Sequence, residues 1–402
     1  MNLPFPAIRL AAFLLVPLFL AGGCNFGEVL DPGPVDGSGD VKDPPAVDND
    51  NDDDTGVTPP DTTGGGTPPD STGGGTPPDD PPTGEGLLGN SLPADWRPFA
   101  SSAPWNTPIP TNAPERPGAA TVLSYMATQA SNIRFSRSYT IPVWVVNSDE
   151  MPFEIVRSDK IYDTWDRDRD GWSDVGVPLS RDMWGENTGD GHICVIDPYK
   201  QIAWEMSRFG WSSGSTPQCT TFNIWDLSGR GYADADAGGR WQLIGGRGSG
   251  FPLIAGLIRP EEVEAGEINH ALVFTFGSNR KADNGDNMFI SPPGARSDGK
   301  FTGDKYPIEG SLFQLDPTLT ERDFDSWGLA PSARIVARAL QRYGMYLCDN
   351  GGDWALQVQL LSSESSEHVA RWNDRVPGFY SAVEDIPTDA FRLIDTGEVI
   401  TK

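Results

Sequence analysis

The 402-residue sequence predicts a mainly β fold, a two-sheet jelly-roll-like sandwich with a few peripheral helices, preceded by a long polar segment. Two observations support this prediction. After residue 88, short runs rich in β-branched and aromatic residues recur, and Gly, Pro, Asn and Asp separate them. Between residues 25 and 88 such residues are rare, so that segment lacks the material for a core. We therefore expect three parts, residues 1–24, 25–88 and a single domain over 89–402.

The domain contains five runs with the composition of strands and two with the pattern of helices. Helices are expected over 119–129 and 332–343. The second helix follows Pro331, which suits a first helical position, and ends before Gly344, which suits the residue after a helix. The strand runs are residues 140–146, 192–196, 201–205, 241–244 and 270–276.

The N-terminus resembles the signal peptide of a bacterial lipoprotein. Arg9 precedes an apolar run over 10–20, which is shorter than the roughly 20 residues of a transmembrane helix, and three small residues lead to Cys24. The resemblance implies a lipid on Cys24 and membrane contact through that anchor alone, although Leu20 lies one position further from the cysteine than usual. Asn25 follows where aspartate would favour the inner membrane, which implies the outer membrane or cell surface. An ordinary cleaved signal is the alternative.

Residues 25–88 have the composition of a disordered tether. They contain an acidic run at 48–54 and a nine-residue repeat that begins at Thr63 and again at Thr72. A flexible chain of this length reaches roughly 40–50 Å. Its 15 Asp and Glu residues and one Lys account for about half of the net charge of −27. The domain is also acidic, which predicts that the protein does not bind nucleic acid.

Three cysteines remain if Cys24 carries a lipid. An odd number in an oxidising compartment predicts one disulfide and one free buried thiol, and the sequence leaves the pairing open among Cys194, Cys219 and Cys348.

The sequence DRDRDGWSD at 166–174 matches the first nine positions of an EF-hand calcium loop. Position 12 is Val177 instead of glutamate, and no helices flank the loop, so a carboxylate from elsewhere would complete a structural calcium site. A solvated acidic turn is the alternative. The expected ligands are the side chains of Asp166, Asp168 and Asp170, the carbonyl of Trp172, and Asp174 directly or through water.

His192, Glu205 and His270 are the predicted catalytic residues. If Asp197 pairs with Lys200 across a two-residue turn, His192 lies directly opposite Glu205 on one sheet face. A Glu–His pair suits general acid–base catalysis, and with His270 the three side chains would form a His₂Glu metal site. Histidines at strand starts also hold loops through hydrogen bonds, so a structural role remains open.

The carboxylates and tryptophans of the domain indicate a site for sugars. Glycosidases place two carboxyl groups roughly 5–10 Å apart, and Glu205 is one candidate. Seven of the 13 tryptophans lie between 165 and 241, and indole faces stack on sugar rings, although core packing explains most of them. We expect Trp204, Trp211 and Arg296 to contact substrate. The candidate partners of Glu205 are Asp190, Asp226, Asp236 and Glu262.

Six patches of the domain form a pattern of their own. They are residues 102–110, 189–197, 235–237, 252–259, 266–272 and 339–346, with Glu205, Glu262 and Asp349 beside them. Together they resemble a broad group of secreted bacterial β-sandwich proteins without an established activity. One stretch, 293–299, departs from the group, because Arg296 stands where relatives often have histidine. A role that needs this histidine therefore does not carry over.

These observations together predict a monomeric, surface-tethered extracellular enzyme that acts on a polysaccharide. We slightly prefer a glycoside hydrolase over a polysaccharide lyase, because an acidic domain is a poor host for uronate polymers. In a hydrolase Glu205 would be the acid or nucleophile, whereas in a lyase His192 or His270 would abstract the proton. The alternative is a non-catalytic glycan-binding or adhesive lipoprotein with a structural calcium site.

Overall fold

The computed structural model describes residues 86–158, 172–212, 216–233 and 246–402. All described residues belong to one compact unit. The predicted signal peptide, Cys24 and nearly all of the tether therefore lie outside the described residues. So do Asp166, Asp168, Asp170, Asp236 and the strand expected over 241–244, and the side chain of Asp174 is not described either.

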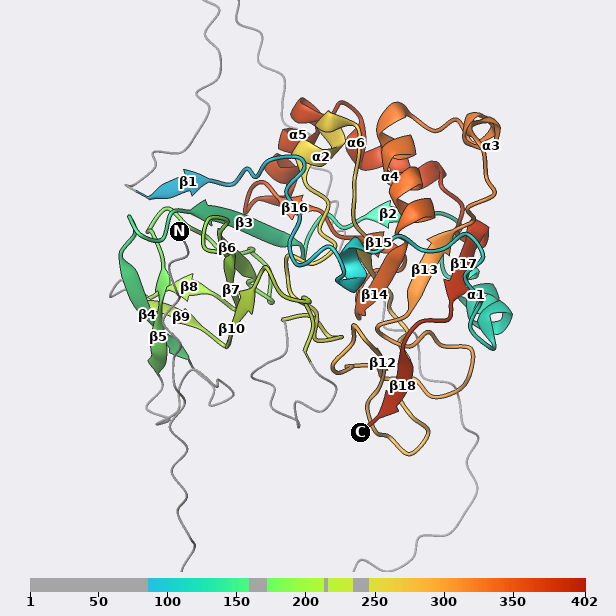
Figure 1. Ribbon diagram of the computed structural model, residues 1–402, viewed down its shortest axis with the longest axis horizontal. Coiled ribbons are helices and arrows are strands. Elements are labelled where there is room, and N and C mark those ends of the chain that lie inside the picture. The colour runs from blue at the N-terminus through green and yellow to red at the C-terminus, as the bar shows by residue number, and fades with distance from the viewer. Residues whose placement is uncertain (1–85, 159–171, 213–215, 234–245) are drawn as a thin grey trace, which may run out of the picture. The chain divides into compact units, whose positions relative to one another are not determined.

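The predicted mainly β fold is confirmed, and the strands form several sheets, some of them mixed (Figure 1). The first large sheet has the order β1–β3–β6–β7–β10, and β16 also pairs with β3. Its middle strands β3 and β6 are buried along their whole length, which suits their runs of Val and Ile. The bounds are β1 Leu87–Gly89, β3 Ile141–Val146, β6 Ile193–Asp197, β7 Ile202–Ser207, β10 Thr221–Asp226 and β16 Gln359–Leu360.

The second large sheet has the order β17–β13–β14–β11–β15–β2. Two smaller sheets have the orders β5–β4–β9–β8 and β12–β18. The bounds in the second large sheet are β2 Arg134–Phe135, β11 Leu272–Thr275, β13 Leu312–Leu315, β14 Met345–Asp349, β15 Ala355–Leu356 and β17 Phe391–Ile394. Those in the smaller sheets are β4 Phe153–Ser158, β5 Trp172–Pro178, β8 Gly210–Trp211, β9 Pro217–Cys219, β12 Met288–Ser291 and β18 Glu398–Thr401.

The jelly-roll arrangement is not confirmed, because both large sheets mix parallel and antiparallel pairs. Strand β3 runs parallel to β6 and to β16, and β11 runs parallel to β14. A jelly roll is antiparallel throughout. Parallel neighbours need a long crossover connection, and the alternation of residues along one strand does not show which distant strand lies beside it.

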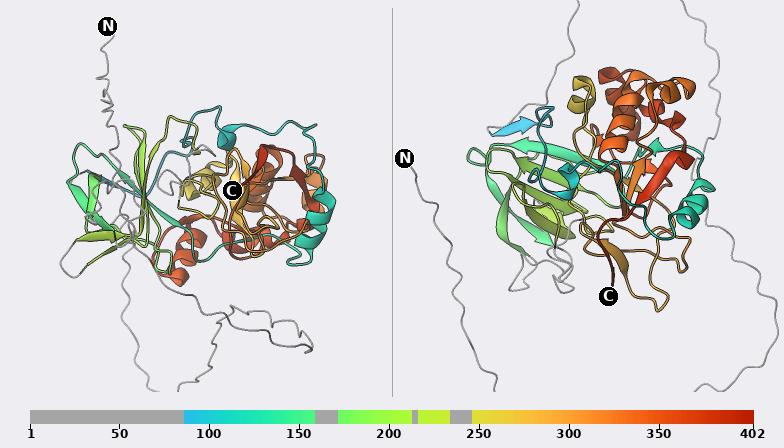
Figure 2. Two further views of the ribbon diagram at one scale, coloured as in Figure 1. Left: turned by 90° about the horizontal axis from the view of Figure 1, so that it is seen from below. Right: turned by 45° about the vertical axis from the view of Figure 1, so that its right-hand side comes forward.

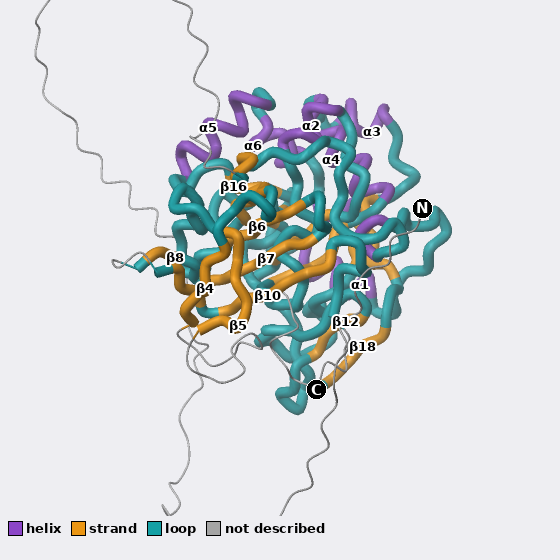
Figure 3. The backbone as a smooth tube through the Cα atoms, turned by 60° about the vertical axis from the view of Figure 1, so that its left-hand side comes forward, coloured by secondary structure: helices purple, strands orange, loops and turns teal. Residues whose placement is uncertain are grey.

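Both predicted helices are confirmed with small changes at their ends. Helix α1 spans Ala119–Ala127, and α4 spans Pro331–Arg342, with Gly344 in the left-handed conformation just beyond it. Helices α2, α3, α4, α5 and α6 gather on one side of the domain, while α1 lies apart (Figures 1 and 3). Their bounds are α2 Pro260–Ala265, α3 Glu321–Ser326, α5 Ser365–Arg375 and α6 Phe379–Ala382, with 3₁₀ turns at Pro104–Asn106, Val383–Asp385 and Thr388–Ala390.

One of three apolar cores connects the two large sheets. It combines Val143 and Ile196 of the first sheet with Val273 and Tyr346 of the second. Each fully buried side chain of this size contributes roughly 1.5–3 kcal/mol. The turned views in Figure 2 show the strands of the first sheet on one side and the C-terminal strands and helices on the other. This core therefore brings segments from both halves of the domain together. Among the described residues, no helix combines the length and apolarity needed to cross a membrane.

Candidate active site

The register between β6 and β7 differs from the expected one. Cys194, not His192, lies opposite Glu205, and Asp197 lies opposite Ile202. The predicted direct pairing of His192 with Glu205 was therefore wrong. Because the shift amounts to two residues, the alternation of strand side chains still places both on one face of the sheet.

The turn after β6 explains this difference. The Asp197 carboxylate accepts hydrogen bonds from the backbone N–H groups of Tyr199 and Lys200, both at 2.9 Å, and from both donors of Ser148. Gln201 then adopts a positive φ of 57°. The side chain of Asp197 thus organises a turn with four residues between the paired ends, where a two-residue hairpin turn was expected.

Glu205 is fully buried and anchors a loop. Its Oε1 atom accepts a hydrogen bond from the N–H of Ile254 at 3.0 Å and lies 3.8 Å from the Sγ atom of Cys194. Its Oε2 atom accepts one from Nε1 of Trp225 at 2.9 Å. Burial raises the pKa of Glu205 to about 7. Both oxygens already have partners inside the protein, so this carboxylate holds the loop after Arg247 against the sheet and does not face a substrate.

His192 is a poor base. Its side chain is buried, and burial together with the positive charge of Arg247 lowers its pKa to about 3. The imidazole is therefore neutral under ordinary conditions. Its Nδ1 atom has no hydrogen-bond partner within the described part of the chain.

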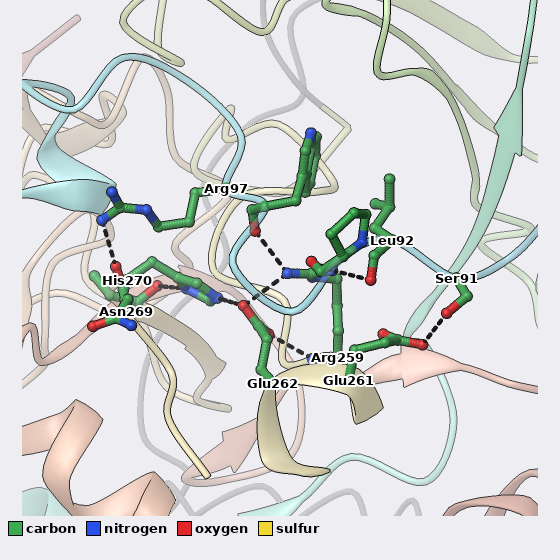
Figure 4. Close-up of polar contacts among 11 residues, drawn as sticks. Ser91, Leu92, Arg97, Arg259, Glu261, Glu262, Asn269 and His270 are labelled. Carbon is green, nitrogen blue, oxygen red and sulfur yellow. Dashed lines mark hydrogen bonds and ion pairs between the residues drawn. The ribbon is translucent and has the colours of Figure 1, made fainter. Parts of the chain in front are cut away.

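His270 belongs to a separate buried network (Figure 4). One ring nitrogen, Nε2, lies 2.9 Å from Oε1 of Glu262, and the other lies 2.9 Å from the carbonyl oxygen of Ala271. The same Glu262 oxygen accepts a hydrogen bond from Nη2 of Arg259 at 3.0 Å. Arg259 in turn donates to the carbonyl groups of Leu92, Pro93 and Trp96.

This network stabilises the fold by joining two segments of the chain. Burial opposes ionisation of Glu262, but the charges and hydrogen bonds of His270 and Arg259 outweigh it and keep the pKa of Glu262 below its usual value. The network ties the segment around residues 92–96 to the start of α2. His270 thus pairs with Glu262 and not with Glu205, so the expected His₂Glu metal site is not formed. No group of three or more His, Cys, Asp or Glu residues in the described ranges could hold a metal ion.

A second cluster of charged groups brings carboxyl groups close to one another. Asp349 ends β14, Asp298 lies in the loop after β12, and Glu309 precedes β13. Gly248 lies between the two aspartates. A Cβ atom on Gly248 would be 2.5 Å from Oδ1 of Asp298 and 2.6 Å from Oδ1 of Asp349, so these two oxygens are at most about 5 Å apart. This upper limit lies below the about 6.5 Å at which the wider class of paired catalytic carboxyl groups begins.

Two carboxyl groups of this cluster, those of Asp349 and Glu309, resist ionisation. Burial, followed by the charge of Asp298, raises the pKa of Asp349 to about 7, although the N–H of Gly248 donates to its Oδ2 atom at 2.8 Å. Burial, followed by the charges of Asp298 and Asp349, holds the pKa of Glu309 well above its usual value. Glu309 also accepts a hydrogen bond from Nδ2 of Asn279 at 2.9 Å. We therefore expect Glu309 to be protonated near neutral pH, and Asp349 to be partly so.

Two arginines complete the cluster. Arg247 is 3% exposed, donates from Nη2 to the carbonyl oxygen of Leu253 at 2.8 Å, and contacts the Sγ atom of Cys348 at 3.7 Å. Arg296 donates from Nη2 to the carbonyl oxygen of Arg247 at 2.7 Å. Burial lowers the pKa of Arg296, while the charges of Asp349 and its neighbours oppose that change. The expected site residue Arg296 thus lies within the carboxylate cluster.

Asp190, one of the predicted partners of Glu205, lies at the exposed rim of this cluster. Burial and the nearby charge of Asp298 raise its pKa against the opposing charge of Arg208. The segment that precedes β6 therefore reaches the same charged region as the loop that carries Asp298.

Several buried polar atoms around the cluster retain hydrogen-bonding capacity. They have no partner among the described residues, although buried polar groups are nearly always hydrogen-bonded. Ser249 and Asn279 are 0% exposed. These groups can bind a polar molecule or water beside the carboxylates. The atoms are Oγ of Ser249, Oδ1 of Asn279, Nε of Arg247 and Nδ1 of His192.

The two tryptophans expected to bind substrate differ from that expectation. Trp204 is 4% exposed and packs in the core beside Phe153, so its role as a substrate contact was wrong. Trp211 is partly buried, donates from Nε1 to the carbonyl oxygen of Met183, and has the guanidinium of Arg181 4.1 Å from its ring centre. One face of its ring is therefore already occupied by Arg181.

All three described cysteines are buried free thiols, so the predicted disulfide was wrong. Cys194 and Cys348 both contribute to the core between the large sheets, whereas Cys219 belongs to another core. Burial raises the pKa of Cys348 to about 12, and burial and the charge of Glu205 raise that of Cys194. These thiols therefore act as small apolar side chains.

Comparisons with known proteins give no relative: no family model, no curated protein and no solved structure matches this chain. The site is therefore assigned from its geometry alone. Arg296 and Asp190 are predicted from the sequence, whereas Asp298 and Glu309 are not, and Asp349 belongs only to the resemblance described above. The position of Asp349 at the end of a buried apolar run is the one sequence signal that indicated it.

Proposed function

We propose that this protein is an exported, surface-tethered glycoside hydrolase that acts on a polysaccharide. The observation that carries the proposal is the pair Asp298 and Asp349, whose oxygens meet beside Gly248 at most about 5 Å apart. Asp349 supplies the proton to the leaving oxygen, because a pKa of about 7 lets it act as an acid near neutral pH. Asp298 supplies the second carboxyl group.

The neighbouring groups support this division of roles. Asn350 donates from Nδ2 to Oδ1 of Asp298 at 2.6 Å, which orients that carboxyl group. Glu309, kept neutral by burial, lies beneath it and accepts from the N–H of Asp298 at 3.3 Å. The two arginines offset the negative charge of the cluster. Glu205 then has a positioning role, because it anchors the loop that carries Arg247 and Gly248.

Hydrolysis is favoured over β-elimination on chemical grounds. A lyase needs a base that is neutral but readily protonated, together with positive charge that is free to face a uronate. With a pKa of about 3, His192 accepts a proton poorly, and His270 is held between Glu262 and a backbone carbonyl. The positive charges of Arg247 and Arg296 already face carboxyl groups of the protein.

The screen that tests this proposal uses the full chain and a panel of polysaccharides. We expect new reducing ends without absorbance at 235 nm, the signal of an unsaturated lyase product. The Asp349→Asn variant should lose the activity, whereas Asp385→Asn, which changes an exposed aspartate, should keep it. Binding of a glycan without either product would exclude the enzyme and leave a glycan-binding lipoprotein. Products that absorb at 235 nm would establish a lyase instead.

The lipid anchor and the calcium site are part of the same proposal. We propose that Cys24 carries the lipid and that the loop at 166–174 binds structural calcium between β4 and β5. Calorimetric titration of calcium into the Asp168→Ala, Asp170→Ala double variant should show no binding, and binding equal to that of the parent chain would exclude the site. A Cys24→Ala variant should no longer label with a fatty-acid analogue in a bacterial host.

The arrangement of the large sheets also belongs to the proposal. We propose that they form the two layers of a sandwich, which is supported by the apolar core that takes residues from both. In this arrangement the loops after β12 and β14 converge at one edge of the core, where the carboxylate cluster lies.

A further inference from the structure

We propose that the hydrolysis retains the configuration at the anomeric carbon, with Asp298 as the nucleophile and Asp349 as the acid and then the base. This inference rests on the proposed glycosidase function and adds its stereochemistry. Retaining and inverting glycosidases differ in the space between their two carboxyl groups, because an inverting enzyme must place a water molecule between one carboxylate and the sugar.

Both aspartates approach Gly248 closely, and this sets an upper limit on the distance between their facing oxygens. Inverting enzymes need about 6.5–9.5 Å between the groups, and retaining enzymes about 5–5.5 Å. The facing oxygens of Asp298 and Asp349 both lie within 2.6 Å of the point where a side chain of Gly248 would begin. They are therefore at most about 5 Å apart, which is less than the about 6.5 Å that an inverting enzyme needs. A residue with a side chain at this position would force them apart.

The two aspartates are held differently, and each environment suits its role. Asp298 is exposed, and Nδ2 of Asn350 donates both to its Oδ1 atom and to its carbonyl oxygen, at 2.6 and 2.8 Å. It is thus an accessible, oriented carboxylate. Asp349 is only partly exposed, and the N–H of Gly248 fixes its Oδ2 atom, which leaves Oδ1 on the side of Asp298.

Two buried polar atoms of the same segments lack a described partner: Oγ of Ser249, next to Gly248 in the chain, and Oδ1 of Asn279, whose amide nitrogen donates to Glu309. Ser249 is 0% exposed, and Asn279 is equally buried. A hydroxyl and an amide oxygen in this setting fit the hydroxyl groups of a sugar.

The reaction then has two balanced steps. In the first, Asp349 gives its proton to the glycosidic oxygen as the bond from that oxygen to the anomeric carbon breaks. A carboxylate oxygen of Asp298 forms a bond to the same carbon from the opposite face and gives a glycosyl ester. In the second, Asp349 takes a proton from water, the water oxygen bonds to the anomeric carbon, and the ester bond breaks. Two inversions leave the configuration unchanged.

The interaction between the two groups supports the change of role of Asp349. The charge of Asp298 raises the pKa of Asp349 in the free protein. Ester formation removes that charge, so the pKa of Asp349 falls and its carboxylate becomes available as a base. The same proximity that suits nucleophilic attack thus also allows one residue to act first as acid and then as base.

The first test is the configuration of the newly formed product. The polysaccharide that the full chain hydrolyses is followed by ¹H NMR during the first minutes, before mutarotation. We expect the first anomer to have the configuration of the cleaved bond. The opposite anomer would overturn retention while leaving a glycosidase. Hydrolysis of no polysaccharide on the panel would overturn the proposed function, and retention with it.

The second test assigns the two residues by azide rescue. The substrate is a dinitrophenyl glycoside of the sugar that the parent chain releases. Asp298→Ala with azide should give a glycosyl azide of inverted configuration, and Asp349→Ala should give one of retained configuration. Asp385→Ala should give none. Exchanged outcomes, or no azide product from variants that keep the melting temperature of the parent chain, would overturn the assignment.

Discussion

The Arg259–Glu262–His270 network lies in the interior and the Asp298–Glu309–Asp349 cluster extends from the interior to the surface, and carboxyl groups in the two regions have pKa shifts in opposite directions. In the network, Glu262 faces a cation and an imidazole, and its pKa is lowered. In the cluster, Asp349 and Glu309 face another carboxylate, and their pKa values are raised. The first arrangement stabilises the fold, whereas the second costs stability at neutral pH. Unfavourable charge placement of this kind is typical of functional sites.

The largest expected effect is on activity in the cluster. Asp349→Asn removes the proton that the leaving group needs, and general acid catalysis contributes about 100- to 10,000-fold. We expect kcat/KM on the hydrolysed polysaccharide to fall by that factor while stability stays equal or rises. Full activity of the variant, or easier unfolding than that of the parent chain, would contradict the functional role of the cluster.

The next effect is on stability in the network. Glu262→Gln leaves Arg259 without its buried counter-charge, which costs roughly 3–5 kcal/mol in comparable cases. Urea unfolding should show this loss, while activity per folded molecule stays unchanged.

Glu264→Gln on the same helix is the matched control. Its carboxylate forms an exposed ion pair with Arg375, so the expected cost is below about 1 kcal/mol. Equal destabilisation by both changes would show that the buried network has no special role.

A third variant tests the spacing of the two aspartates without changing their charge. Gly248→Ala adds a single methyl group that must displace the oxygens of both aspartates. A shift of about 1 Å can reduce the rate roughly 100-fold, and we expect such a loss in kcat. Gly210→Ala, where a Cβ atom meets nothing within 4 Å, should have no effect. A Gly248→Ala variant with unchanged kcat would show that the spacing of the carboxylates is unimportant.

The smallest effect is the pH dependence of stability. A carboxyl group with a raised pKa, such as Asp349, penalises the folded state as pH rises from its unfolded value of about 4 to about 7. The lowered pKa of Glu262 acts in the opposite direction, since its contribution is present above the unfolded pKa and is lost as pH falls.

Urea unfolding at several pH values measures this difference. The stability of Asp349→Asn relative to the parent chain should increase between about pH 4 and pH 7 and then level off. That of Glu262→Gln relative to the parent chain should become less unfavourable as pH falls below about 4.5. A constant gap for Asp349→Asn across the whole range would contradict the raised pKa.

Local patterns of the sequence were sufficient to predict individual elements. The spacing of apolar residues between Pro331 and Gly344 indicated α4, and the Val- and Ile-rich runs indicated β3 and β6. Such patterns do not predict which strands pair. The residues of β3 pack in the core against residues more than a hundred positions away, and a local pattern does not contain that information. The four-residue turn after β6 depends on one side chain, that of Asp197, which alternation of residues does not reveal.

The candidate site was predicted only in part for a similar reason. Paired carboxylates and Arg296 were expected, but the chain has 57 Asp and Glu residues and the sequence offers no way to choose among them. Asp298, Glu309 and Asp349 come from three separate segments, and only the fold brings them together. His192 and His270 were predicted as catalytic partly because the chain has only three histidines. His270 instead forms a hydrogen bond with Glu262 in the interior.

The ionisation of Asp349 tests the central claim most directly, because it needs no substrate. Carboxyl ¹³C resonances of the parent chain labelled at aspartate can be titrated beside those of Asp349→Asn to identify the signal that the variant lacks. We predict a midpoint of about 7 for that signal. A midpoint near 4, the value of an ordinary aspartate, would contradict the assignment of Asp349 as the acid of the site.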